Sequence, residues 1–79
     1  MDIDATGDRI VETVKTVKQG KITYTVESDE NGAGDVSYYV VKWDSDGIGE
    51  YDFRNSFRDK NKAIYLLNKL VRKEIAWGI

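Results

Sequence analysis

Residues 21–27 read Lys21-Ile22-Thr23-Tyr24-Thr25-Val26-Glu27, an unbroken alternation of polar and apolar side chains. Successive side chains of a β-strand point to opposite faces, so the spacing predicts a strand with Ile22, Tyr24 and Val26 buried on one side. The rest of the chain is expected to supply neighbouring strands and the layer that covers this apolar face.

The segments that follow predict two further strands. Residues 28–35 contain two glycines and no apolar residue larger than alanine, which is typical of an acidic loop. Residues 36–43 are apolar on both faces, as the central strand of a sheet can be. Residues 44–49 then turn the chain into a third strand over 50–53.

The length of that last turn decides which aromatic side chains share a face. A loop of three or five residues with a glycine in a left-handed position avoids pairing apolar with charged residues across the hairpin. The hydrophobic pattern normally sets the register, so we expect the odd-length loop. The expected buried face comprises Ile22, Tyr24, Val26, Tyr39, Val41, Trp43, Tyr51 and Phe53.

Helical spacing is found on both sides of these strands. In residues 8–19 the apolar positions lie three or four apart, and Gly20 is placed to end a helix. Residues 56–59 have the serine-to-acid spacing of a capping box, and an amphipathic run follows that should end near Gly78. We therefore predict one α+β domain over 1–79, a two-layer α-β-β-β-α fold. Its three-stranded antiparallel meander carries two helices packed on one face.

Composition argues against several functional classes. The 79 residues include no cysteine and no histidine, which removes disulfides, thiolate metal sites and the commonest general base. Asp44 and Asp46 begin like a calcium loop, but Ile48 occupies the next ligand position. We expect no enzyme, no metal and no cofactor. The start Met1-Asp2-Ile3-Asp4 does not resemble a signal peptide and no stretch could span a membrane, so a cytoplasmic location is expected.

Charge is divided along the chain. Residues 1–53 carry a net charge of −7 and residues 54–79 a net charge of +5. If the two hairpin loops project from the same region, their carboxylates could imitate a phosphate backbone and occupy a basic, nucleic-acid-binding site on a partner protein. The alternative is ordinary turn chemistry, which favours the same residue types. The candidate partner-binding acids are Glu27, Asp29, Glu30, Asp35, Asp44 and Asp46.

The C-terminal helix offers a second hypothesis, namely nucleic-acid binding. One ridge of this helix, opposite its apolar face, consists of Lys62, Leu66, Lys69 and Lys73. Clusters of lysines bind phosphate backbones favourably because counterions are released. A solvated helix face has the same composition. A third hypothesis is self-association of the two oppositely charged segments, which leaves the oligomeric state open. The candidate nucleic-acid-binding residues are Arg54, Arg58, Lys60, Lys62, Lys69, Arg72 and Lys73.

Aromatic residues define a further candidate surface. Tyr38 and Val40 on the open sheet face could form an apolar patch with Trp77 and Ile79. Trp77 could instead fold back over the edge of the core.

Two families share features with this chain. The order of elements is similar to that of double-stranded-RNA-binding domains, and residues 59–63 resemble the lysine-rich opening of their second helix, but residues 27–35 are acidic where that family is basic. The short Met-Asp-Ile-Asp start, the N-terminal helix and the acid-rich meander resemble small phage-encoded anti-CRISPR inhibitors. That resemblance implies a non-enzymatic inhibitor of a nucleic-acid-binding protein.

Overall fold

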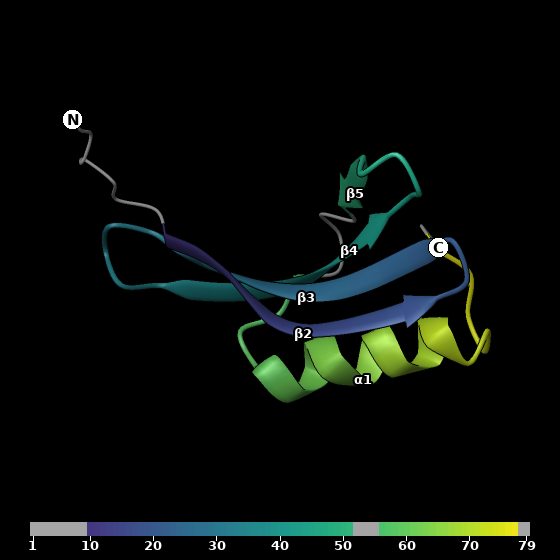
Figure 1. The fold of residues 1–79 in the computed structure, drawn as a ribbon. Helices are drawn as coiled ribbons and strands as arrows, with labels where there is room; N and C mark the ends of the chain where they lie inside the picture. The colour runs from purple at the N-terminus through teal and green to yellow at the C-terminus, as the bar shows by residue number, and fades with distance from the viewer. Residues whose placement is uncertain (1–9, 52–55, 78–79) are drawn as a thin grey trace.

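A computed structural model describes residues 10–51 and 56–77 of the chain. Its sheet is a four-stranded antiparallel meander in the order β2-β3-β4-β5, and one helix packs on one face (Figure 1). The fold is α+β, as predicted, but the described residues contain one helix and four strands. The elements are β2 (Ile10–Gln19), β3 (Ile22–Glu30), β4 (Val36–Trp43), β5 (Gly49–Tyr51) and α1 (Lys60–Val71).

The expected N-terminal helix over 8–19 is wrong, because Ile10–Gln19 forms strand β2. Six of the eight residues from 10 to 17 are β-branched, and their stiff side chains fit a pleated sheet better than a helix. A bulge between Thr13 and Lys15 absorbs the break in strict alternation. Gly20 has φ of 63° and, with Lys21, joins β2 to β3 in a tight hairpin instead of ending a helix.

The β3–β4 hairpin corrects the expected buried face. The loop is five residues long, Asn31 to Asp35, and the register places Val26 opposite Val40 and Thr25 opposite Val41. Residues opposite each other share a face, so the expected buried face is split between the two sides of the sheet. Ile22, Tyr24 and Val26 lie with Tyr38 and Val40 on the side of α1, whereas Tyr39, Val41 and Trp43 lie on the other side.

The β4–β5 hairpin agrees with the expected odd loop length. Trp43 pairs with Gly49 and Val41 with Tyr51, leaving a loop of five residues in which Gly47 has φ of 83°. Tyr39, Val41, Trp43 and Tyr51 therefore share a face as predicted. Phe53, expected on the same face, lies outside the described residues.

Helix α1 is shorter than the sequence predicted. Asp59 caps it by accepting a hydrogen bond from the Asn61 N–H at 2.9 Å, so the N-cap is not Ser56. Phe57 exchanges backbone hydrogen bonds with Tyr38 at 2.6 and 2.7 Å, which holds the preceding segment extended against β4. The helix ends at Val71 and not near Gly78, which lies outside the described residues.

The core lies between α1 and one face of the sheet. Val26, Val40 and Leu67 are almost completely buried, and the Gln19 amide donates to the Val71 carbonyl to tie β2 to the end of the helix. Burial of such side chains is the main favourable term in a chain this small. The residues of the core cluster are Tyr24, Val26, Val40, Ala63, Leu67 and Leu70.

A Schellman motif ends α1 with a residue other than glycine. The Glu74 N–H donates to the Lys69 carbonyl and the Lys73 N–H to the Leu70 carbonyl, both at 3.0 Å. Lys73 occupies the left-handed position with φ of 60°. A left-handed conformation costs a non-glycine residue about 1 kcal/mol or more.

We expect Lys73→Gly to raise the free energy of unfolding by roughly 0.5–1 kcal/mol, because glycine relieves the left-handed strain but gives the unfolded chain more freedom. Urea denaturation would measure the change. Lys62→Gly, at an exposed position within α1, is the matched control and should destabilise by about 1 kcal/mol. A loss of stability in Lys73→Gly would contradict this account of the helix end.

Candidate functional site

The outer ends of three strands form an acidic projection from the core. The first residues of β2, the last of β3 and the first of β4 extend past the start of α1 (Figure 1). We call residues 10–13 and 27–37 the acidic arm. It contains no Lys or Arg. Its acidic residues are Glu12, Glu27, Asp29, Glu30 and Asp35.

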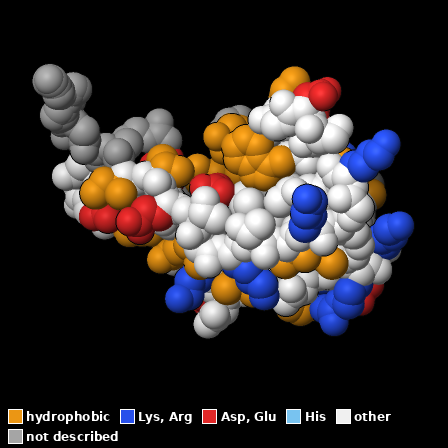
Figure 2. Space-filling model, in the orientation of Figure 1, with side chains coloured by type: hydrophobic (Ala, Val, Ile, Leu, Met, Phe, Trp, Pro, Cys, Tyr) orange, Lys and Arg blue, Asp and Glu red, His pale blue; other side chains and the backbone are white. Residues whose placement is uncertain are grey.

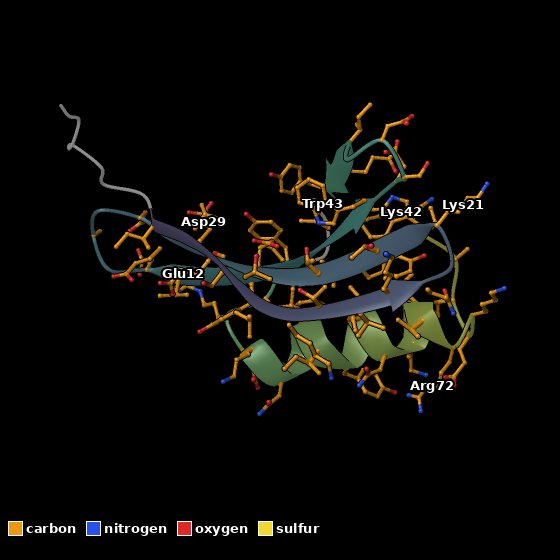
Figure 3. All side chains as sticks on the ribbon, in the orientation of Figure 1. Glu12, Lys21, Asp29, Lys42, Trp43 and Arg72 are labelled. Atoms are coloured by element: carbon orange, nitrogen blue, oxygen red, sulfur yellow. The ribbon has the colours of Figure 1, made fainter. Side chains whose placement is uncertain are left out.

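Negative charge is concentrated on the arm, whereas both signs of charge occur over the rest of the described residues. Figure 2 shows acidic side chains gathered on the arm beside apolar ones, and Lys and Arg over the helix and the far end of the sheet, where some acidic side chains also lie. Glu12 and Asp29 lie at one end of the molecule, while Lys21, Lys42 and Arg72 lie at the other (Figure 3). Such a distribution gives the arm a negative field that acts over roughly one Debye length, about 8 Å at physiological salt.

The structure brings together four of the six predicted acids, Glu27, Asp29, Glu30 and Asp35. Consecutive hairpin loops of a meander lie at opposite ends of the sheet, so Asp44 and Asp46 are at the other end from the arm. Asp44 also has a structural role, because its Oδ1 accepts from the N–H groups of Asp46 and Ile48 at 2.9 and 3.0 Å.

Strand alternation distributes the acids of the arm over both faces. Glu27 and Asp29 lie on the face opposite the helix, whereas Glu12 and Glu30 are on the helix side. Asp35 is in the loop and meets Arg58 at 3.9 Å, a pair whose side chains are both exposed and which contributes little stability. Sequence reasoning missed Glu12 because it assigned residues 8–19 to a helix.

Two exposed apolar residues accompany these acids. Ile10 is 52% and Val11 53% exposed, and both belong to β2, at one edge of the sheet. An edge strand presents backbone hydrogen-bonding groups that another chain can use. Exposed apolar side chains on such an edge can add contacts to a chain that pairs with it.

The sheet face opposite α1, which we call the open face, is aromatic. The indole N–H of Trp43 donates to Thr25 Oγ1 at 2.9 Å, and the rings of Tyr39 and Tyr51 are 5.3 Å apart with an interplanar angle of 59°. Val41 is completely buried beneath this layer. The face was expected to be core, and no helix of the described segments covers it.

Glu27 lies where the acidic arm meets the open face. It is only 8% exposed, and Thr13 Oγ1 donates to both of its carboxylate oxygens at 3.1 Å. Across the next strand its direct neighbour is Tyr39. The sequence placed Glu27 at the polar end of a strand and gave no sign of this burial, because hydropathy alone predicts an exposed side chain.

The basic ridge of α1 is partly neutralised within the chain. Glu74 contacts Lys69 Nζ at 3.3 Å and Arg72 Nε at 3.2 Å. Lys69 also lies 5.1 Å from the centre of the Tyr65 ring, and hydrogen bonding to Tyr65 and then to Glu74 raises its pKa. Arg58, Lys60, Lys62 and Lys73 are exposed, and Arg54 lies outside the described residues.

Trp77 packs against the core without being fully buried. Its ring centre lies 6.4 Å from that of Tyr24, and it forms one wall of a shallow hollow of about 430 Å³ near the end of α1. Lys42, Lys73 and Glu74 also line the hollow. The expected apolar patch is not formed, because Tyr38 and Val40 lie beneath the helix. Its fourth member, Ile79, is outside the described residues.

Comparison with family models, with curated proteins and with solved structures finds no match. Within residues 10–51 and 56–77, no group of three or more acidic side chains is arranged to hold a metal ion. In the same residues no helix is long and apolar enough to cross a membrane.

Proposed function

We propose that this chain is a small, non-enzymatic protein-binding module that docks its acidic arm on a basic surface of a partner protein. A nucleic-acid-binding site is the kind of surface that it would occupy, which would make the chain an inhibitor of the phage type. The observation that carries the proposal is the arm itself, five carboxylates without a single Lys or Arg on a projection beyond the core.

Two kinds of interaction would act one after the other during binding, first long-range electrostatic attraction and then short-range contacts of β2. The negative field of the arm would steer a basic partner into encounter, which raises association rates by roughly 10- to 1,000-fold at low salt. The exposed side chains of Ile10 and Val11 and the backbone of β2, an edge strand among the described residues, would then supply short-range contacts. Carboxylates give the arm only hydrogen-bond acceptors, so basic side chains are the natural complement.

Nucleic-acid binding by α1 is less well supported. Two of the seven candidate residues, Lys69 and Arg72, share the carboxylate of Glu74. Phosphate contacts there would have to compete with these intramolecular pairs.

The proposal is tested by reversing charge on the arm. We expect Glu12→Lys with Glu30→Lys to slow association with an immobilised arginine- and lysine-rich peptide about tenfold at low salt, and to weaken the dependence of the rate on salt. Biolayer interferometry at two salt concentrations would measure both. Glu12 and Glu30 make no ion pair among the described residues, so the fold should tolerate the change.

Asp46→Lys with Glu50→Lys is the matched control, because it changes the net charge equally at the other end of the sheet. Equal losses in both double variants would mean that only net charge matters and would refute docking by the arm. Salt-sensitive binding of duplex RNA or DNA, with no binding of the basic peptide, would favour the helix ridge instead.

A further inference from the structure

A buried carboxylate that has no cationic partner among the described residues lies at the base of the acidic arm. Glu27 is 8% exposed, yet among residues 10–51 and 56–77 its side chain accepts hydrogen bonds only from Thr13 and forms no ion pair with Lys or Arg. A carboxylate offers about four acceptor positions, and burying one without a cation is costly. The carboxylate of Glu27 therefore has acceptor capacity that this part of the chain does not use.

The position of Glu27 restricts what could satisfy it. The register puts it on the open face, directly between Thr13 of β2 and Tyr39 of β4. Tyr39 contacts Tyr51, so two aromatic rings lie on the β4 side of the carboxylate. Aromatic faces attract cations, and the attraction grows as water is excluded. Asp29 lies two residues further along the same face.

We propose that Glu27 and Tyr39 receive one arginine side chain of the partner. This inference rests on the proposed function and names the group that the partner must present. The guanidinium would donate to the Glu27 carboxylate and lie against the ring of Tyr39, with Tyr51 bordering it. Thr13 Oγ1 is 3.1 Å from each carboxylate oxygen, so it fixes the carboxylate from the β2 side and leaves its remaining acceptor positions for a second donor.

Arginine suits this site better than lysine. Its guanidinium is planar, is weakly hydrated and presents parallel donors that match a carboxylate, and it stacks on aromatic rings. A lysine ammonium is a strongly hydrated point charge and loses more when it is buried. The arm as a whole accepts either residue, whereas the Glu27 site selects one of them.

The test compares three short peptides that differ only in the side chain presented. Their sequences alternate glycine with arginine, lysine or citrulline, the last being isosteric with arginine but uncharged. We expect the arginine peptide to bind the full chain about fivefold more tightly than the lysine peptide and at least tenfold more tightly than the citrulline peptide. NMR titration should show saturable shifts of the Thr13, Glu27 and Tyr39 amides.

Variants separate this inference from the proposed function. Glu27→Gln should reduce the preference for arginine over lysine to about one, while Glu50→Gln, with the same loss of charge at an exposed position, should preserve it. If Glu27→Gln does not fold, Tyr51→Ala serves instead, because Tyr51 is 48% exposed on the short edge strand β5 and borders the site. Tyr51→Ala should lower the preference at least twofold.

Equal binding of the arginine and lysine peptides by the unaltered chain would overturn the arginine site. In that case the proposed function would stand if Glu12→Lys with Glu30→Lys still weakened binding of both peptides. If neither peptide bound at low salt, both proposals would fail.

Discussion

Leu67→Ala is expected to lower the free energy of unfolding by about 3 kcal/mol, since buried leucines cost 2–5 kcal/mol when they are truncated. Leu67 is completely buried between α1 and the sheet, where it packs in the same cluster as Val26 and Val40. Domains of this size have a total stability of roughly 4–12 kcal/mol. The variant should therefore lose a large part of its stability, and its melting temperature should fall by more than about 10 °C.

The control for this variant lies on the opposite side of the same helix. Tyr65 is 59% exposed and its contact with Lys69 lies at the surface, so Tyr65→Ala should change the stability by no more than about 1 kcal/mol. Thermal unfolding followed by circular dichroism would compare the two variants. Similar losses in both would mean that α1 does not cover the sheet through Leu67.

The C-terminal helix could be predicted from the sequence because its pattern has one interpretation. The apolar positions from Ala63 to Val71 recur every three or four residues, and long propensity-favoured runs of this kind rarely form strands. The predicted boundaries of this helix were wrong at both ends. Tertiary contacts decide them, since the pairing of Phe57 with Tyr38 delays the start and the left-handed Lys73 stops the helix early.

The prediction of a helix over residues 8–19 was wrong because the spacing of apolar residues and the residue propensities disagree there. The spacing of Ile10, Val14 and Val17 matches a helical face, but the β-branched composition favours a strand. A bulge allows a strand to carry the irregular spacing. The β-strand propensity of these residues predicts the observed structure better than their spacing does. The strand also needs its pairing with β3, which no local sequence pattern reveals.

The register of β3 on β4 could not be derived for a different reason. Residues 36–43 are apolar on both faces, so either face of β4 could be placed beneath a helix. The five-residue loop selects one register, with Asn31 Oδ1 accepting from the N–H groups of Ala33 and Asp35 at 2.8 and 3.1 Å. This choice places Tyr39, Trp43 and Tyr51 on the open face and so creates the surface next to Glu27.

The acids of the arm were partly predictable. Glu27 to Asp35 are adjacent in sequence, so any hairpin gathers them at one end of the sheet. The prediction that Asp44 and Asp46 lie beside these acids was wrong. It required two successive hairpin loops to lie at the same end of the sheet, but the strands of an antiparallel meander alternate in direction and place successive loops at opposite ends.

Gly49→Ala is expected to destabilise the protein by roughly 1–2 kcal/mol because of the side chain that lies over this glycine. A Cβ at position 49 would be 2.8 and 2.9 Å from two ring carbons of Trp43. Carbon atoms pack best at about 3.5–4.0 Å, so the indole would have to move by more than half an ångström. Overpacking of this kind costs about 1–3 kcal/mol.

Two effects of opposite sign act in Gly49→Ala. Replacing glycine by alanine at an unstrained position stabilises by roughly 0.4–1 kcal/mol through the unfolded state. Moving the indole would also lengthen the 2.9 Å hydrogen bond from Trp43 to Thr25, and a lost hydrogen bond costs about 1 kcal/mol. The steric and hydrogen-bonding terms together exceed the gain, so the net effect should be a loss of stability.

A double-mutant cycle with Trp43→Leu isolates the contact. In the Trp43→Leu background the ring is absent, and Gly49→Ala should become neutral or slightly stabilising, which gives a coupling of about 1–2 kcal/mol in urea denaturation. The same loss in both backgrounds would show that the backbone at position 49 needs glycine for its own conformation. A measured coupling would mean that the absence of a side chain at Gly49 leaves room for the Trp43 ring, whose indole N–H donates to Thr25 Oγ1.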